Sequence, residues 1–140
     1  MTARLTKDSL DIGIVTTNID ESLPFYRDVL GLAYSGPAPI PGGTMHRLEV
    51  GTSSLKLVVT DRAPRAVAAP GGLAGSTGYR YCTLTVGNLA EVLAAVNAAG
   101  RTVKFGPTEL PTGAQIAMVE DPDGNWVELL SPPSTDGNAG

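Results

Sequence analysis

The chain repeats one pattern after half its length. An apolar, β-prone run, LDIGIV at residues 10–15, has a counterpart in YCTLTV at residues 81–86. After each run an asparagine precedes a glutamate by three residues: Asn18 and Glu21, then Asn88 and Glu91. That spacing is typical of a helix N-terminus. Because the second pair follows the first by 70 residues, the sequence indicates two copies of one structural unit.

Each copy continues with a segment of helical periodicity. Apolar side chains recur at spacings of three and four in residues 19–30 (Leu23, Tyr26, Val29, Leu30) and in residues 89–99 (Leu89, Val92, Leu93, Val96). Gly31 and Gly100 stand where such helices end. We therefore predict one helix in each half, and we expect Pro24 to distort the first turns of the earlier one.

Two β-prone segments joined by turn-forming residues follow each predicted helix. In the first half they are residues 45–50 and 55–60, and in the second half they are residues 115–120 and 125–130. Such pairs are typical of hairpins. Tyr34 and residues 103–105 add a short strand after each helix, so each half reads β-α-β-β-β and the fold class is α+β.

The length of 140 residues suits a single domain. We place the first module at residues 8–60, a connector at 61–77, the second module at 78–131 and a flexible tail at 132–140. The connector, rich in Gly, Pro and Ala, is long enough to act as a lid. Residues 35–43, SGPAPIPGG, are predicted to form a second loop.

Charge and hydropathy exclude several classes of partner. The net charge is −4 and no cluster of Lys or Arg occurs, so we expect no nucleic-acid partner. No apolar run approaches the ~20 residues of a membrane span. The N-terminal residues carry no apolar signal segment, so a cytoplasmic location with no membrane partner is expected.

The single cysteine and the single histidine limit the possible chemistry. Cys82 lies inside a predicted strand and is expected to be a buried structural thiol. His46 is the only histidine, which excludes mechanisms that need two histidines in one chain. It lies on the first predicted hairpin, where it is expected to be exposed or to reach a cavity.

A carboxylate interrupts the last apolar strand. In DPDGNWVELL, residues 121–130, Glu128 stands among Trp126, Val127 and Leu129. Burying an unpaired carboxylate is costly. Glu128 must therefore face either water or a group that needs its charge.

Two stretches together resemble motifs of the vicinal oxygen chelate superfamily: DIGIVTTNIDESLPFYRDVLGL (residues 11–32) and DPDGNWVELL. This superfamily includes glyoxalase I, extradiol dioxygenases and bleomycin-resistance proteins. The resemblance implies two βαβββ modules that form curved mixed sheets around a small-molecule cavity. It also implies a homodimer.

Metal-dependent members of that superfamily bind the metal at four positions, usually through His, Glu or Gln, His and Glu. The resemblance places Asp11, Lys56, Tyr81 and Glu128 there, and only Glu128 matches. An ammonium offers no lone pair, and its charge repels a divalent ion. We therefore expect no metal and no cofactor.

Strand alternation indicates what would surround these four side chains. Glu128 shares a strand face with Trp126, and Tyr81 shares one with Thr83. If the resemblance holds, the four polar groups line one cavity with Trp126 as a flat wall. The candidate substrate-binding residues are Trp126, Met118, Thr83, His46 and Tyr79.

The leading hypothesis is metal-independent acid/base chemistry on a small carbonyl compound, of isomerase, epimerase, cyclase or lyase type. Lys56 would polarise the carbonyl, Glu128 or Asp11 would act as base, and Tyr81 would donate a hydrogen bond to the developing oxyanion.

Two alternatives remain open. One is non-catalytic small-molecule binding or sequestration, as in bleomycin-resistance proteins, although the aromatic fraction of 5% disfavours a large planar drug. The other is structural: Lys56 would replace the metal as an ion bridge between Asp11 and Glu128.

Overall fold

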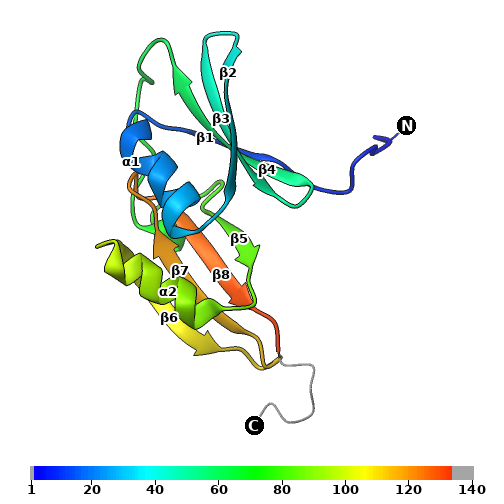
Figure 1. Cartoon of the computed structure of the whole chain (residues 1–140), viewed down its shortest axis with the longest axis vertical. Helices are drawn as coiled ribbons and strands as arrows, with labels where there is room; N and C mark the ends of the chain where they lie inside the picture. Colours follow the sequence, from blue (N-terminus) through cyan, green and yellow to red (C-terminus); the bar gives the residue numbers. More distant parts are fainter. Residues whose placement is uncertain (1, 134–140) are drawn as a thin grey trace. The chain divides into compact units, whose positions relative to one another are not determined.

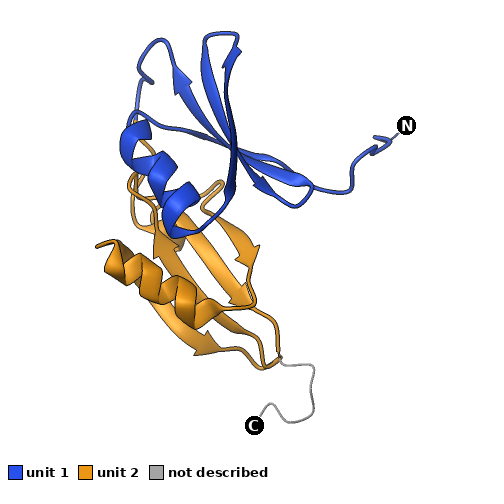
Figure 2. Cartoon of the chain, in the orientation of Figure 1, with its two compact units in different colours: residues 1–66 blue, residues 67–140 orange. Residues whose placement is uncertain are grey.

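The chain divides into two compact units, Met1–Ala66 and Val67–Gly140, in the computed structural model (Figure 2). The structure describes residues 2–133. Most of the predicted flexible tail, residues 134–140, lies outside the described residues. The second half of the predicted connector, residues 67–77, belongs to unit 2.

Unit 1 contains one helical segment and a four-stranded sheet (Figure 1). Its elements are β1 (Ile12–Val15), α1 (Ile19–Pro24), the π-helical turn η1 (Phe25–Val29), β2 (Ala33–Ile40), β3 (Gly43–Val50) and β4 (Ser53–Thr60). The strand order is β1-β4-β3-β2. β1 pairs with β4 in parallel, and the other pairs are antiparallel.

Unit 2 repeats this topology. Its elements are the 3₁₀ turn η2 (Gly72–Ala74), β5 (Tyr81–Thr85), α2 (Leu89–Ala98), β6 (Thr102–Glu109), β7 (Gln115–Glu120) and β8 (Trp126–Ser131). The strand order is β5-β8-β7-β6, again with one parallel and two antiparallel pairs. The predicted α+β fold of two βαβββ modules is confirmed.

The core of each unit lies on one face of its sheet. In unit 2, α2 packs against β6 and β8 and buries Leu93 and Val96. The buried strand side chains share one face by register: Leu84, Ala117, Val119, Val127 and Leu129. In unit 1, Phe25 and Tyr26 are buried with Leu48, Leu55 and Leu57. The opposite face of each sheet therefore carries the side chains that are free to form a site.

Both helices begin where the sequence predicts, but the asparagines do not cap the backbone. Asn18 and Asn88 make no side-chain cap hydrogen bond. Each donates instead through Nδ2 to a glutamate, Glu21 at 2.9 Å and Glu91 at 3.1 Å. Pro24 has no N–H to continue a regular helix, and the wider turn η1 follows it.

The prediction of a loop at residues 35–43 is wrong, because β2 continues to Ile40. Gly36 and Pro37, joined by a cis peptide bond, lie at a register shift between Ser35 and Ala38. A proline is tolerated here because β2 is an edge strand and its outer N–H groups have no partner strand. The predicted short strand at residues 103–105 is likewise longer, and β6 includes the cis peptide Gly106–Pro107.

Cys82 lies on the helix-facing side of β5, beside Val127. Burial raises the pKa of the Cys82 thiol, and the nearby charge of Asp121 raises it further. The thiol therefore stays protonated at neutral pH, as expected of a structural cysteine. Across residues 2–133, no helix has both the length and the hydrophobicity needed to cross a bilayer.

Candidate functional site

The open face of the unit 2 sheet brings five of the predicted site residues together. By register, Tyr81 lies beside Trp126, and Thr83 lies beside Glu128. Met118 lies on the other side of Glu128. Paired residues of neighbouring strands point to the same face, so these side chains form one continuous surface.

This surface is hollowed into a pocket of about 380 Å³. Its lining is mostly apolar and aromatic, with one carboxylate and one ammonium: Leu73, Tyr81, Lys104, Phe105, Ile116, Met118, Trp126 and Glu128. Both the volume and the composition are those of pockets that bind small organic molecules.

Glu128 is the carboxylate of this pocket. Thr83 donates a hydrogen bond through Oγ1 to Glu128 Oε1 at 2.7 Å. Within residues 2–133 the side chain has no ion pair, and this is its one side-chain hydrogen bond. The strand alternation that buries Val127 and Leu129 turns Glu128 to the open face. Thr83 therefore orients a carboxylate whose second oxygen is available to a ligand.

Trp126 forms part of the pocket wall and is held by polar and apolar contacts. Its indole Nε1 donates to Glu120 Oε2 at 3.3 Å. The same carboxylate oxygen lies 3.7 Å from Lys104 Nζ, so Glu120 partly neutralises the ammonium at the pocket edge. The indole is thus fixed in orientation while one ring face contacts the backbone at Gly72.

Asp11 and Lys56 lie on the corresponding open face of unit 1, and each is already bonded. Asp11 accepts hydrogen bonds from Lys7 Nζ at 2.9 Å and from the backbone N–H of Ser54 at 2.7 Å. Lys56 Nζ lies 3.9 Å from the other Asp11 oxygen. Chiefly the Lys7 hydrogen bond, and then that of Ser54, holds the pKa of Asp11 below its ordinary value.

Further charges of unit 1 extend this network across β3. Arg47 Nη2 donates to Ser54 Oγ at 3.1 Å, and Ser54 Oγ donates to Glu49 Oε2 at 3.0 Å. Arg47 Nε and Glu49 Oε1 are 3.5 Å apart. The open face of unit 1 is therefore a surface of mutually paired charges.

The structure separates His46 from Lys56 and Asp11 by placing it on the other side of the unit 1 sheet. Its register partner is Leu57, which is buried on the helix-facing side. His46 Nδ1 and the Tyr34 hydroxyl are 2.7 Å apart, and the two rings are stacked with centroids 5.9 Å apart. His46 is half-buried rather than an exposed hairpin residue.

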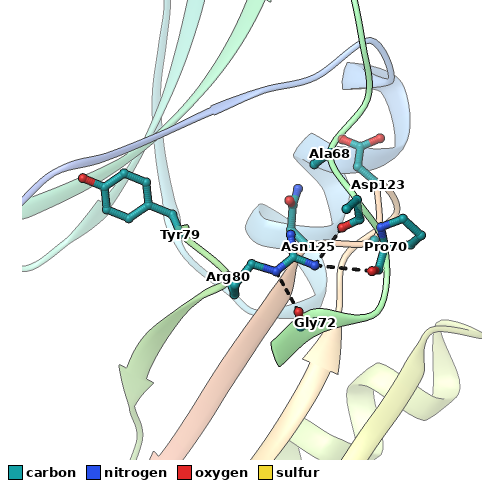
Figure 3. Close-up of a pocket in the computed structure, with 9 residues that line it drawn as sticks. Ala68, Pro70, Gly72, Tyr79, Arg80, Asp123 and Asn125 are labelled. Atoms are coloured by element: carbon teal, nitrogen blue, oxygen red, sulfur yellow. Dashed lines mark hydrogen bonds between the residues drawn. The ribbon is translucent and has the colours of Figure 1, made fainter. Parts of the chain in front are cut away.

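Tyr79 does not line the unit 2 pocket. Its side chain is fully exposed and points away from Arg80 (Figure 3). It borders a separate hollow of about 40 Å³ beside Arg80 and Asn125. That volume is about a tenth of the volume of the unit 2 pocket.

Four pocket residues were not predicted from the sequence: Leu73, Lys104, Phe105 and Ile116. Alternation along β7 could have found Ile116, which shares a face with Met118. A register shift between Val103 and Phe105 interrupts the alternation of β6, so simple counting cannot place Lys104 and Phe105. Leu73 comes from the predicted connector and has no local sequence signal.

Asp11 and Lys56, the two unit 1 members of the four-position site that the sequence resemblance implies, offer little to a divalent ion. Lys56 contributes an ammonium, and the Asp11 oxygens already bond to Lys7, Ser54 and Lys56. Within residues 2–133, no three side chains of His, Cys, Asp or Glu gather as a metal site would require. The available donors instead suit hydrogen bonding to an organic ligand.

Solved structures from several sources share this fold. A glyoxalase family protein from Bacillus cereus has a TM-score of 0.80 and 15% identity, over 94% of this chain and 97% of that one. The trypanothione-dependent glyoxalase I of Leishmania major has a TM-score of 0.68 and 21% identity, over 90% and 87% of the two chains. An antibiotic-binding protein from Streptomyces sp. CB03234 has a TM-score of 0.67 and 21% identity, over 92% and 99%.

At these identities the structural likeness shows the fold alone. No curated protein sequence matches the chain significantly. The family model described as Glyoxalase/Bleomycin resistance protein/Dioxygenase superfamily matches residues 10–129, which include both modules. The chain therefore belongs to the Glyoxalase/Bleomycin resistance protein/Dioxygenase superfamily.

Proposed function

We propose that this protein binds a small organic molecule in the unit 2 pocket without a metal, and that the ligand combines a flat apolar body with a protonated amine. The observation that carries the proposal is a carboxylate set in an aromatic and apolar pocket of about 380 Å³. One solved structure of the same fold is an antibiotic-binding protein, which supports a binding role.

The aromatic walls favour a flat ligand. Tyr81, Phe105 and Trp126 all line the pocket, although the chain has few aromatic residues overall. Aromatic surfaces attract both apolar rings and cations that lie over a ring face. The low aromatic content of the sequence therefore does not argue against a planar ligand, because these side chains are concentrated at one place.

Glu128 supplies the polar anchor. Thr83 occupies one of its oxygens, and the other can accept a hydrogen bond from a ligand ammonium. A hydrogen bond between charged groups is about twice as strong as a neutral one. A protonated amine seated among aromatic rings and bonded to Glu128 would satisfy the carboxylate, which has no ion-pair partner in residues 2–133.

A ligand screen tests this proposal. Flat aromatic amines and neutral isosteres of the same shape are compared by thermal shift and then by calorimetry. We expect the amines to bind more tightly, and Glu128→Gln to weaken amine binding by about tenfold or more, since hydrogen bonds to charged groups contribute about 1.5–3 kcal/mol.

Glu49→Gln is the matched control, because it removes a carboxylate from the open face of unit 1. It should leave the dissociation constant of the amines within about twofold of wild type. Equal affinity of wild type and Glu128→Gln for every amine would refute the proposed anchor.

Acid/base chemistry is a second candidate, favoured by the presence of a base and a hydroxyl donor in one pocket. Glu128 would remove a proton from the carbon next to a carbonyl, and Tyr81 would donate a hydrogen bond to the enolate oxygen. Return of the proton to another face or carbon would complete an isomerisation or epimerisation. Cyclase or lyase chemistry would use the same first step.

An ammonium group of unit 2 would polarise the carbonyl in this reaction. Lys104 lines the pocket itself, whereas Lys56, the group predicted from the sequence, is paired with Asp11 in unit 1. Asp11, the alternative base, is bonded to Lys7 and Ser54. The Glu128 mechanism therefore needs only groups of unit 2.

Proton exchange distinguishes catalysis from binding. Small carbonyl compounds are incubated with the protein in D₂O, and loss of the C–H signal next to the carbonyl is followed by NMR. Exchange that disappears in Glu128→Gln supports catalysis, and comparison of Lys104→Gln with Lys56→Gln identifies the cation. Absence of exchange for compounds that bind leaves binding alone as the function.

A further inference from the structure

The second half of the connector is tied to unit 2 by one arginine. Arg80 Nε donates to the carbonyl of Gly72 at 2.7 Å, and Nη2 donates to the carbonyl of Ala69 at 2.7 Å (Figure 3). Nη2 also lies 3.4 Å from the carbonyl of Pro70. The planar guanidinium thus fixes three points of one segment, which we call the strap, residues 69–75.

The strap passes directly over the indole of Trp126. Gly72 has φ of +57°, a conformation that favours glycine. A Cβ atom at this position would lie 2.2 Å from two indole carbons. Backbone conformation and packing therefore both require glycine, and the strap backbone covers part of the only tryptophan in the chain.

Gly75 is constrained by packing alone. A Cβ atom there would lie 1.9 Å from the carbonyl oxygen of Pro70 and 2.4 Å from Arg80 Nη2. Its N–H donates to the carbonyl of Gly72 at 3.1 Å. The strap is therefore a tight turn folded around the Arg80 guanidinium.

The residue next to Gly72 reaches the ligand pocket. Leu73 is 58% exposed, a large value for a leucine, and it lines the pocket together with Trp126. The strap thus contributes one pocket wall directly through Leu73 and fixes a second wall through its contact with the indole.

We propose that Arg80 is a positioning residue of the ligand pocket, and that the strap it holds determines through Gly72 and Leu73 which ligands fit beside Trp126. The inference rests on the proposed function, because it takes the unit 2 pocket as the ligand site. Arg80 itself touches the strap backbone and acts on the ligand only through it.

Trp126 fluorescence tests the strap without any ligand. Acrylamide quenching is measured for wild type, Arg80→Gln, Arg80→Lys and Gly72→Ala, with Arg65→Gln as a control in the exposed part of the connector. We expect the quenching constant to rise at least about twofold in Arg80→Gln and Gly72→Ala as the indole is uncovered. Arg80→Lys should rise less, because an ammonium can still reach a carbonyl.

Circular dichroism and urea unfolding establish that each variant remains folded at the temperature used. Gly72→Ala keeps Arg80, so it provides an independent test if Arg80→Gln is too unstable. A quenching constant equal to that of wild type in both Arg80→Gln and Gly72→Ala would overturn the inference.

The aromatic amines of the screen test the effect on the pocket. We expect Arg80→Gln to raise their dissociation constants by about fivefold or more, and Gly72→Ala to change their order of affinity. Increased quenching with unchanged affinities would overturn the role of the strap in ligand selection. If no amine binds wild type, the proposed function fails, and the quenching experiment still decides whether Arg80 holds the strap over Trp126.

Discussion

Lys56 in unit 1 and Glu128 in unit 2 lie at equivalent positions of two sheets that have the same topology. Each residue lies in the last strand of its module and on the open face. Their register neighbours differ in chemistry: Gly13 and Arg47 in unit 1, Thr83 and Met118 in unit 2. One topology therefore carries two different surfaces.

The neighbours determine what each charge can do. Gly13 offers no side chain, so Lys56 turns to Asp11, and Arg47 and Glu49 complete a network of paired charges. In unit 2, Thr83 orients Glu128 among aromatic and apolar side chains. The two units therefore differ on the open face, while the helix-facing side of each last strand stays apolar, with Leu57 in unit 1 and Leu129 in unit 2.

The largest expected effects test the apolar core on the helix-facing side of each sheet. Leu57 and Leu129 are both fully buried on the helix-facing side of the last strand. Leu57→Ala and Leu129→Ala should each lower the free energy of unfolding by about 2–5 kcal/mol, because each leaves a cavity. Urea unfolding measures both. A loss in one unit only would show that the two cores are not equivalent.

Ligand affinity tests the difference between the two open faces. Tyr81→Ala removes an aromatic wall of the unit 2 pocket and should raise the dissociation constant of a bound aromatic amine by about tenfold. Arg47→Ala removes a charge from the open face of unit 1 and should change it by less than about twofold. Calorimetry measures both, and the reverse order would place the ligand on unit 1.

Acid titration sharpens the account of the unit 1 network. The pKa of Asp11 is lowered from its ordinary value of 3.8 by Lys7, Ser54 and Lys56, so its ionised form stabilises the folded state above that pH. This contribution is lost as the pH falls through the folded-state pKa. Asp11→Asn should therefore be less stable than wild type at neutral pH, and the difference should shrink below pH 3.8.

Asp61→Asn is the control for this titration, since Asp61 is exposed. Asp61→Asn keeps the contacts of Asp11 with Lys7 and Ser54, so it should not reproduce the loss of stability expected of Asp11→Asn. Urea unfolding between neutral and acidic pH provides the measurement. A difference between wild type and Asp11→Asn that stays constant across the acid range would contradict the assigned network.

The smallest expected effects concern the helix starts. Asn18 and Asn88 each bond to an exposed glutamate side chain and do not cap the backbone. Asn18→Ala and Asn88→Ala should each cost less than about 1 kcal/mol, as is usual for exposed polar pairs. Thermal unfolding measures this change in the free energy of unfolding. A loss of about 2 kcal/mol, the upper range for a true backbone cap, would contradict the prediction.

The fold could be predicted because its signals are local and repeated. The two asparagine–glutamate pairs and the apolar spacing of Leu89, Leu93 and Val96 locate the helices. Residues 35–43 were missed because glycine and proline usually indicate loops, whereas an edge strand tolerates them. Tertiary context, which a local pattern does not contain, decides such cases.

The site could be predicted only in part. Strand alternation brings Tyr81, Thr83, Trp126 and Glu128 to one face, where the structure has them. The strand register puts His46 on the face opposite Lys56, because His46 pairs with Leu57, the residue after Lys56. The place of Phe105 in the pocket depends on a register shift in β6, and that of Leu73 depends on the strap. Neither feature can be predicted from residue types alone.

The central claim is that the ligand occupies the unit 2 pocket beside Trp126. The most direct test is to titrate wild-type protein with the tightest aromatic amine while recording fluorescence of this single tryptophan. We predict a saturable change in emission whose midpoint equals the calorimetric dissociation constant. Calorimetric binding with no change in Trp126 emission would contradict the claim.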